Sequence, residues 1–226
     1  MSFIVKNTTK NNILDLFCPY RCRKCGSLGS LLCGCCKKDI IKQVKNDCQL
    51  INKLPKDQQK DFKTWFKNGW TCGWRDQIIG QLTQDYKFHS QRAAAPILAE
   101  ILAQILPSSL PQDLIIVPLP TSSKHIRQRG FDHTKQIAKY LAKYRGWQSQ
   151  IILCRNHNKT QVGSSLEQRY RQAEEAYMIK SKIDPHQKYL LLDDIWTTGA
   201  SLCAAGKLFK DNGVSKIYTA TIAISR

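Results

Sequence analysis

Apolar runs and helical apolar stripes alternate along the second half of the chain. Short apolar runs at residues 114–117, 151–153 and 189–192 suit strands that are buried on both faces, and residues 214–224 follow as a final strand. Apolar positions at helical spacing mark residues 92–106, 137–146 and 200–210 as helices. This alternation predicts an α/β fold in which a parallel sheet is flanked by helices.

The first half of the chain is more polar and carries a cluster of cysteines. Six of the ten cysteines lie between residues 18 and 36. Two pairs leave the two-residue gap that lets both thiolates face one tetrahedral metal ion. The sequence therefore predicts a structural Zn²⁺ held by Cys22, Cys25, Cys33 and Cys36.

Two further cysteines and several basic residues surround the expected zinc site. Cys18 and Cys35 are spare, and either could replace a ligand. A disulfide framework is the alternative, although bridges are rare among reducing thiols. Four thiolates and one divalent ion sum to −2, which neighbouring cations would offset. These cations are Arg21, Arg23, Lys24, Lys37 and Lys38.

The composition along the chain predicts three parts. Residues 1–50 form the N-terminal zinc-binding module, and residues 51–90 a helical linker or hood segment. This segment is lysine-rich and is expected to contain a helix near residues 57–66, with further apolar positions at helical spacing at Ile78, Ile79 and Leu82. Residues 91–226 form the main domain.

Charge points to a polyanionic partner. The 226 residues contain 35 Lys and Arg against 17 Asp and Glu, which gives a net charge of +18. Trp65, Trp70 and Trp74 lie among lysines, an arrangement that would suit single-stranded DNA if the rings stack on bases. The alternative is a solvated basic surface over tryptophans that belong to the core. No apolar run approaches a membrane span, and residues 1–7 do not resemble a secretory signal, so a cytoplasmic location is expected.

The most informative stretch follows the apolar run at residues 189–192. Asp193 and Asp194 come where the strand should end, and a hydroxyl-rich loop then opens the next helix. Backbone amides at a helix N-terminus favour a phosphate, whereas carboxylates repel it and instead accept hydrogen bonds from sugar hydroxyls. The predicted phosphate loop comprises Thr197, Thr198, Gly199, Ala200 and Ser201. The alternative is an ordinary strand-to-helix turn in which Asp and Thr only cap the helix.

A second polar segment follows the strand at residues 114–117. Pro118 and Pro120 end the ladder, and Lys124, Arg127 and Arg129 then lie in a loop that suits an anion. Arg127 and Arg129 are the predicted pyrophosphate contacts. Asp132 is expected to cap the next helix. Residues 155–171 are polar and are typical of a mobile flap over a site.

The string of residues 189–201 resembles the 5-phosphoribosyl-1-pyrophosphate (PRPP) loop of type I phosphoribosyltransferases. With residues 118–120, the segment 127–131, Gln161 and Arg169 in order, nearly the whole chain is similar to the ComF family. This resemblance implies an N-terminal zinc module joined to a phosphoribosyltransferase-type domain, PRPP bound with Mg²⁺, and a role in DNA uptake and natural transformation alongside the competence helicase or recombination proteins. Asn158 and Gln172 depart from the family pattern in the flap.

Two hypotheses follow from the sequence. In the first, the protein is an enzyme in which Asp193 and Asp194 bind the ribose diol during phosphoribosyl transfer to an unidentified acceptor. In the second, it is a non-catalytic accessory protein of competence that binds single-stranded DNA or a partner. Fold alone does not choose between them.

Overall fold

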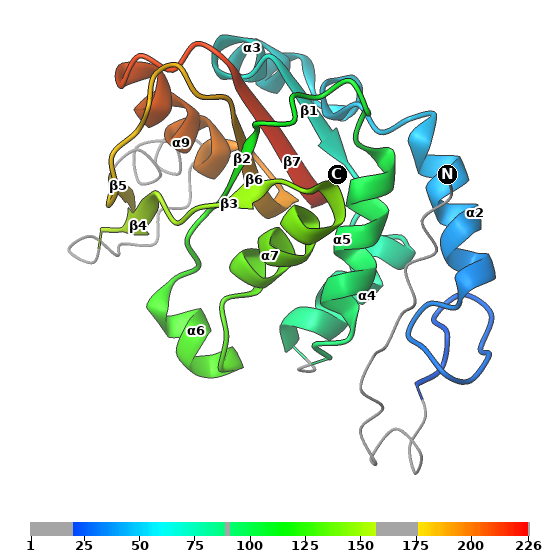
Figure 1. The fold of residues 1–226 in the computed structure, drawn as a ribbon. Helices are drawn as coiled ribbons and strands as arrows, with labels where there is room; N and C mark the ends of the chain where they lie inside the picture. The colour runs from blue at the N-terminus through cyan, green and yellow to red at the C-terminus, as the bar shows by residue number, and fades with distance from the viewer. Residues whose placement is uncertain (1–19, 89–90, 157–175, 226) are drawn as a thin grey trace.

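A five-stranded parallel sheet forms the centre of the computed structural model, which describes residues 20–88, 91–156 and 176–225 (Figure 1). Its strands are β1 (Asn68–Thr71), β2 (Ile115–Pro118), β3 (Gln148–Ser149), β6 (Tyr189–Trp196) and β7 (Ile217–Ile224). Their order across the sheet is β1-β7-β6-β2-β3, and all pairs are parallel. β6 and β7 are therefore interior strands, which explains their nearly continuous apolar sequences.

Helices cover both faces of this sheet (Figure 1). On one face lie α4 (Ile78–Phe88), α5 (Ala94–Ile105) and α7 (His133–Arg145), and on the other lie α3 (Lys56–Trp65) and α9 (Ala200–Asp211). The period of two in β6 sorts its side chains between the faces. Leu190 and Leu192 join the core under α5 and α7, whereas Leu191 joins the core under α3 and α9. The predicted α/β fold class is confirmed.

Smaller elements complete the described residues. The 3₁₀ turn η1 (Leu50–Lys53) precedes α3, and α6 (Ser123–Arg129) follows β2. A separate two-stranded antiparallel sheet pairs β4 (Leu153–Arg155) with β5 (Tyr177–Ile179). Asp132 caps α7 by accepting a hydrogen bond from the Lys135 N–H, as its position before the apolar stripe predicts.

Three local expectations differ from the structure. The loop after β2 contains α6, because Ser122 provides an N-cap and Gly130 a left-handed C-cap with φ 75°. The apolar run 151–153 does not form one strand of the main sheet, because that sheet ends with β3 and the chain then enters β4. The segment 51–90, expected to be a helical linker, also contributes the edge strand β1 to the sheet.

The cysteine-rich segment packs directly onto the main core. Cys22 and Cys36, which lies on α2 (Gly34–Lys45), are buried in the same hydrophobic cluster as residues of α4 and α5. Arg23 Nε donates to Asp85 Oδ2 at 2.7 Å, and Lys37 Nζ contacts Glu100 Oε2 at 2.6 Å. Apolar burial and two ion pairs thus fix this segment against α4 and α5.

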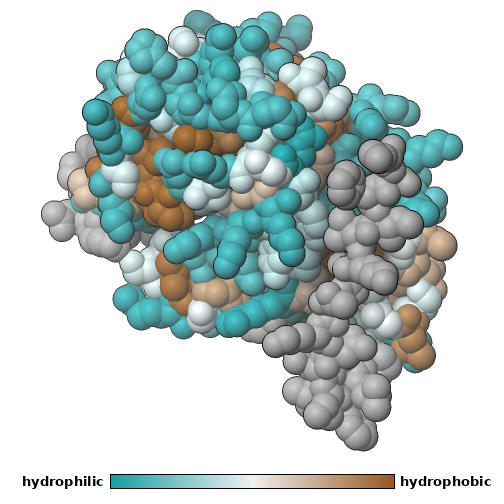
Figure 2. Space-filling view, in the orientation of Figure 1, coloured by the Kyte–Doolittle hydropathy of each residue, from teal (hydrophilic) through white to brown (hydrophobic). Residues whose placement is uncertain are grey.

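The tryptophans do not form one exposed stacking surface. Trp70 on β1 is 1% exposed and stacks on Tyr218 with ring centroids 6.1 Å apart. Trp65 and Trp74 are half-buried against the core that contains α3 and α9. The face seen in Figure 2 is mostly hydrophilic, with only scattered hydrophobic areas. Among the described residues, no helix is both long enough and apolar enough to span a membrane.

Candidate functional site

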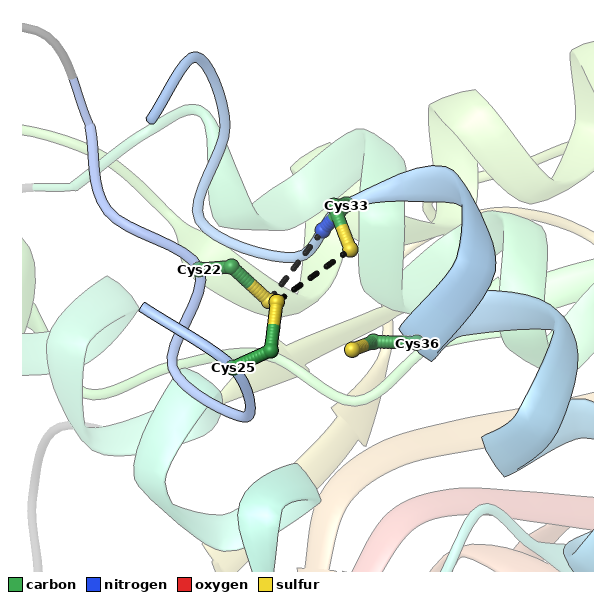
Figure 3. A group of neighbouring side chains, drawn as sticks. All are labelled: Cys22, Cys25, Cys33 and Cys36. Carbon is green, nitrogen blue, oxygen red and sulfur yellow. Dashed lines mark hydrogen bonds between the residues drawn. The ribbon is translucent and has the colours of Figure 1, made fainter. Parts of the chain in front are cut away.

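Four cysteine side chains converge between a loop and the start of α2 (Figure 3). Cys22 and Cys25 come from the loop, and Cys33 and Cys36 come from the N-terminal end of the helix. All four sulfur atoms lie within 4.8 Å of one another, and Sγ of Cys25 is 3.7 Å from Sγ of Cys33. A tetrahedral zinc–thiolate site with bonds of about 2.3 Å has sulfur atoms roughly 3.8 Å apart. The cluster thus fits one metal ion, consistent with structural zinc.

Hydrogen bonds favour the thiolate form of two cysteines in this cluster. Burial alone would raise the pKa of Cys22, but backbone N–H groups, that of Cys33 first among them at 3.4 Å from Sγ, lower this pKa to about 6. Backbone and side-chain hydrogen bonds from Cys36 lower the pKa of Cys33. Thiolate rather than thiol is the metal-binding form. Cys35 is exposed on α2 and outside the cluster, and Cys18 lies outside the described residues.

Most basic neighbours of the cluster have carboxylate partners. Arg23 pairs with Asp85, Lys24 with Asp39 and Lys37 with Glu100. These three residues therefore also pair with acids, and the compensation of a −2 site by the neighbouring cations stays a prediction.

A polar cavity of about 210 Å³ opens where β2 and β6 end. Parallel strands place their carboxyl ends at one edge of the sheet, and ligands of open α/β sheets bind in that crevice. Four of the residues predicted from the sequence line the cavity: Asp193, Asp194, Ser201 and Arg129. Other lining residues come from distant segments, among them Lys87, His133, Arg155 and Tyr177.

Asp194 is held by two donors inside the cavity. Lys87 Nζ from the last turn of α4 and His133 Nε2 from the first turn of α7 both contact its Oδ2. All three side chains are at most 13% exposed. Burial by itself would raise the pKa of Asp194, but the hydrogen bond from His133 and the charge of Lys87 outweigh it and hold the pKa below its usual range.

Asp193 lies in a different environment from its neighbour. Burial, together with the adjacent negative charge of Asp194, raises the pKa of Asp193 to about 7. Its Oδ1 accepts a hydrogen bond from the Asp194 N–H at 2.8 Å. Two consecutive carboxyl groups are thus driven in opposite directions, which is typical of functional sites.

The loop after β6 depends on a glycine for its shape. Gly199 has φ +77° and is the N-cap residue of α9. A Cβ at this position would lie 2.1 Å from an atom of the Trp196 ring. Trp196 is itself buried and donates from Nε1 to Gln58 Oε1 at 2.8 Å. Only glycine therefore lets the chain pass over this ring and present Ser201 to the cavity.

The structure separates other residues predicted for the site. Arg129 lines the cavity, whereas Arg127 is exposed and does not. Both lie on α6, where side chains two positions apart point in different directions. In the predicted phosphate loop, Thr197 is exposed and Thr198 half-buried, while Ala200 is buried at the start of α9.

Some residues that line the cavity lie beyond what motif reading detects. Lys87 and Arg155 reach the cavity from α4 and β4, so the sequence offers no local signal for them. His133 directly follows the capping Asp132, and its position beside the predicted anion segment was the available signal. The flap residues 157–171, including Gln161 and Arg169, lie outside the described residues.

A larger open groove lies away from these sites. It has a volume of about 750 Å³ and is bordered by residues of α2, α5 and α7. Its arginine, Arg145, donates to the carbonyl groups of Ala103, Leu106 and Pro107. These bonds give hydrogen-bond donors to carbonyl groups at the C-terminal end of α5, so we assign Arg145 a structural role.

A known protein is similar to this chain in sequence. No family model matches the chain. Over 207 residues the chain is 24% identical to "Competence protein ComFC" of Streptococcus pneumoniae, an alignment that covers 88% of this chain and 84% of the relative. The resemblance to the ComF family is confirmed.

Solved structures provide a weaker comparison for this ComF-like chain. A hypoxanthine phosphoribosyltransferase from Staphylococcus aureus is 13% identical, covers 65% of this chain and 62% of its own, and gives a TM-score of 0.34. The strand order and the helices on both faces of the sheet show the α/β fold directly.

Proposed function

We propose that the cavity at the ends of β2 and β6 binds PRPP or a related ribose phosphate, and that the protein acts in DNA uptake and natural transformation. One observation carries the proposal. The paired acids Asp193 and Asp194 line the same cavity as Ser201 at the start of α9 and the guanidinium groups of Arg129 and Arg155. Acceptors for a diol and donors for phosphates thus lie together. The name of the pneumococcal relative supports the link to competence.

Each part of the ligand has a matching group in this cavity. The ribose hydroxyls would donate to the carboxyl group of Asp193 and to Asp194, which Lys87 and His133 hold in place. The 5-phosphate would accept from the N-terminal amides of α9 and from the Ser201 hydroxyl. Mg²⁺ would arrive with the pyrophosphate, whose oxygen atoms are the ligands that this ion prefers.

The pyrophosphate would lie nearest to the two arginines. Phosphoribosyl transfer breaks the bond between the sugar carbon and the pyrophosphate oxygen, and a nucleophile forms the new bond to that carbon. Arg129 and Arg155 would stabilise the negative charge on the departing pyrophosphate. The acceptor stays unassigned, so the proposal covers binding first and transfer second.

Calorimetric titration tests the binding step. PRPP with Mg²⁺ should bind the wild-type protein, and Asp193→Asn should weaken this binding by about tenfold or more, because the amide offers the diol one acceptor oxygen in place of the two of the carboxyl group. Asp211→Asn, an exposed acid at the far end of α9, should bind like the wild type. Absence of heat with millimolar PRPP would end the proposal.

Charge favours a second function, the binding of single-stranded DNA. The net charge is +18, and Lys38, Lys42 and Lys45 are exposed along α2. If these lysines neutralise phosphates, the affinity for an oligonucleotide should fall along a steep line against salt in a log–log plot. Because Trp70 is buried, base stacking on it is not part of this hypothesis. A flat salt dependence would exclude the phosphate contacts.

A further inference from the structure

His133 joins the two halves of the proposed ligand site. The residue is 4% exposed, and its ring lies between Asp194 on β6 and Arg129 on α6. Nε2 contacts Asp194 Oδ2, and Nδ1 is 3.1 Å from Nη1 of Arg129. One imidazole therefore bridges the group assigned to the sugar and a group assigned to pyrophosphate.

The chemistry of the neighbours fixes the protons on this ring. A guanidinium group has N–H donors and no acceptor, so Nδ1 must accept the hydrogen bond from Arg129. Nε2 then carries the hydrogen and donates to Asp194. Thr121 Oγ1 is 3.4 Å from Nδ1, but its hydroxyl donates to Asp132 Oδ1 at 3.0 Å and leaves Nδ1 to Arg129. The result is a directed chain of hydrogen bonds from Arg129 through His133 to Asp194.

We propose that His133 is a positioning residue that couples the binding of pyrophosphate at Arg129 to the binding of a ribose hydroxyl at Asp194. This inference rests on the proposed function. Arg129 is half-buried at the cavity and lies over the Phe88 ring at 5.2 Å, and a bound anion would restrict the rotamers of this long side chain further. An anion that fixes Arg129 also fixes the ring that donates to Asp194, so the carboxylate is already oriented when the sugar arrives. The first ligand removes an ordering cost for the second, which gives positive cooperativity.

Two substitutions at one position separate this coupling from simple structural support. The amide of His133→Gln keeps one donor and one acceptor and can maintain both hydrogen bonds. His133→Leu fills the buried site but can do neither. If His133 only supported the fold, His133→Leu would weaken the binding of each ligand separately. The effect of one bound ligand on the affinity for the other would stay the same.

The experiment titrates ribose 5-phosphate into the full chain in the presence and absence of saturating inorganic pyrophosphate. The ratio of the two dissociation constants is the coupling factor. We expect the same factor in wild type and His133→Gln, and a factor lower by roughly fivefold or more in His133→Leu. Electrostatic repulsion between the two anions is present in all three proteins, so it cancels in this comparison. Urea unfolding of each variant confirms that it is folded before titration.

The other possible outcomes distinguish the role of His133 from the proposed function. If both ligands bind but the factor is the same in all three proteins, the role of His133 is refuted while the proposed function stands. If pyrophosphate and ribose 5-phosphate exclude each other in the wild type, the coupling is likewise refuted. If neither ligand binds the wild type, the proposed function itself fails, and this inference fails with it.

Discussion

Substitution of Gly199 by alanine tests the geometry of the loop between β6 and α9. Its φ of +77° costs an alanine about 1–2 kcal/mol. In addition, the new Cβ would lie 2.1 Å from an atom of the Trp196 ring, and overpacking of this kind costs about 1–3 kcal/mol. Together these costs predict a loss of about 2–5 kcal/mol in the free energy of unfolding, which is a large share of a typical total.

A matched glycine separates the two contributions. Gly146, the C-cap of α7, has φ +68° but nothing within 4 Å of a built Cβ. Gly146→Ala should therefore lose only the backbone part, about 1–2 kcal/mol. Urea unfolding followed by tryptophan fluorescence measures the free energy of unfolding of both variants. In a thermal scan, each kcal/mol of lost stability should lower the melting temperature by about 2–4 °C.

A double variant identifies the clash itself. In Trp196→Leu the ring atoms that the alanine Cβ would meet are gone. The combination with Gly199→Ala should then be less destabilised than the sum of the single variants, by about 1–3 kcal/mol. If Gly199→Ala is no worse than Gly146→Ala, or if the two substitutions are additive, the placement of Trp196 under this loop is refuted.

Three further predictions address the site, the cysteines and the large groove. Burial raises the pKa of Asp193 to about 7, well above its unfolded value, so the folded state holds this proton more tightly than the unfolded state. The stability that this proton contributes near pH 4 is therefore lost as the pH rises through 7. Asp193→Asn should remove this pH dependence, which is on the order of a few kcal/mol in urea unfolding between pH 4 and 8. Parallel pH profiles of the two proteins would contradict it. Cys25→Ser should leave well under one equivalent of zinc by metal analysis, whereas Cys35→Ser should keep about one, and equal losses would exclude the proposed ligand set. Arg145→Met should lose about 1–3 kcal/mol in urea unfolding, because three part-buried carbonyl groups at the end of α5 lose their donor. Lys143→Met, an exposed neighbour, should lose little, and similar losses in the two variants would refute the structural role of Arg145.

Sequence reasoning succeeded where the signal is local. The apolar residues 189–192 fall within β6, Asp132 caps α7, and the two cysteine pairs meet in one cluster. A strand buried on both faces, a helix cap and a metal knuckle each depend on residues close together in the chain. Such features can therefore be identified without knowledge of the fold.

Other parts depend on contacts between distant segments. β1 has only the sequence Asn-Gly-Trp-Thr, and it becomes a strand because β7 offers it a parallel partner. Lys87 reaches Asp194 across more than a hundred residues of chain, so nothing near Lys87 predicts the contact. Arg127 and Arg129 resemble equivalent anion contacts in the sequence, but the helix α6 turns them to different sides. Tertiary packing decides these cases.

The position of β7 between β1 and β6 also affects how the chain folds during synthesis. β1 can join the parallel sheet only after β7 has left the ribosome, about 150 residues later. At a translation rate of about 5–20 residues per second, this interval lasts roughly 7–30 s. Throughout it, Trp70 lacks the Tyr218 ring on which it stacks in the finished sheet. The nascent chain therefore carries a large aromatic residue on a strand that still lacks its neighbour in the sheet, and incompletely paired strands of this kind are substrates for chaperones.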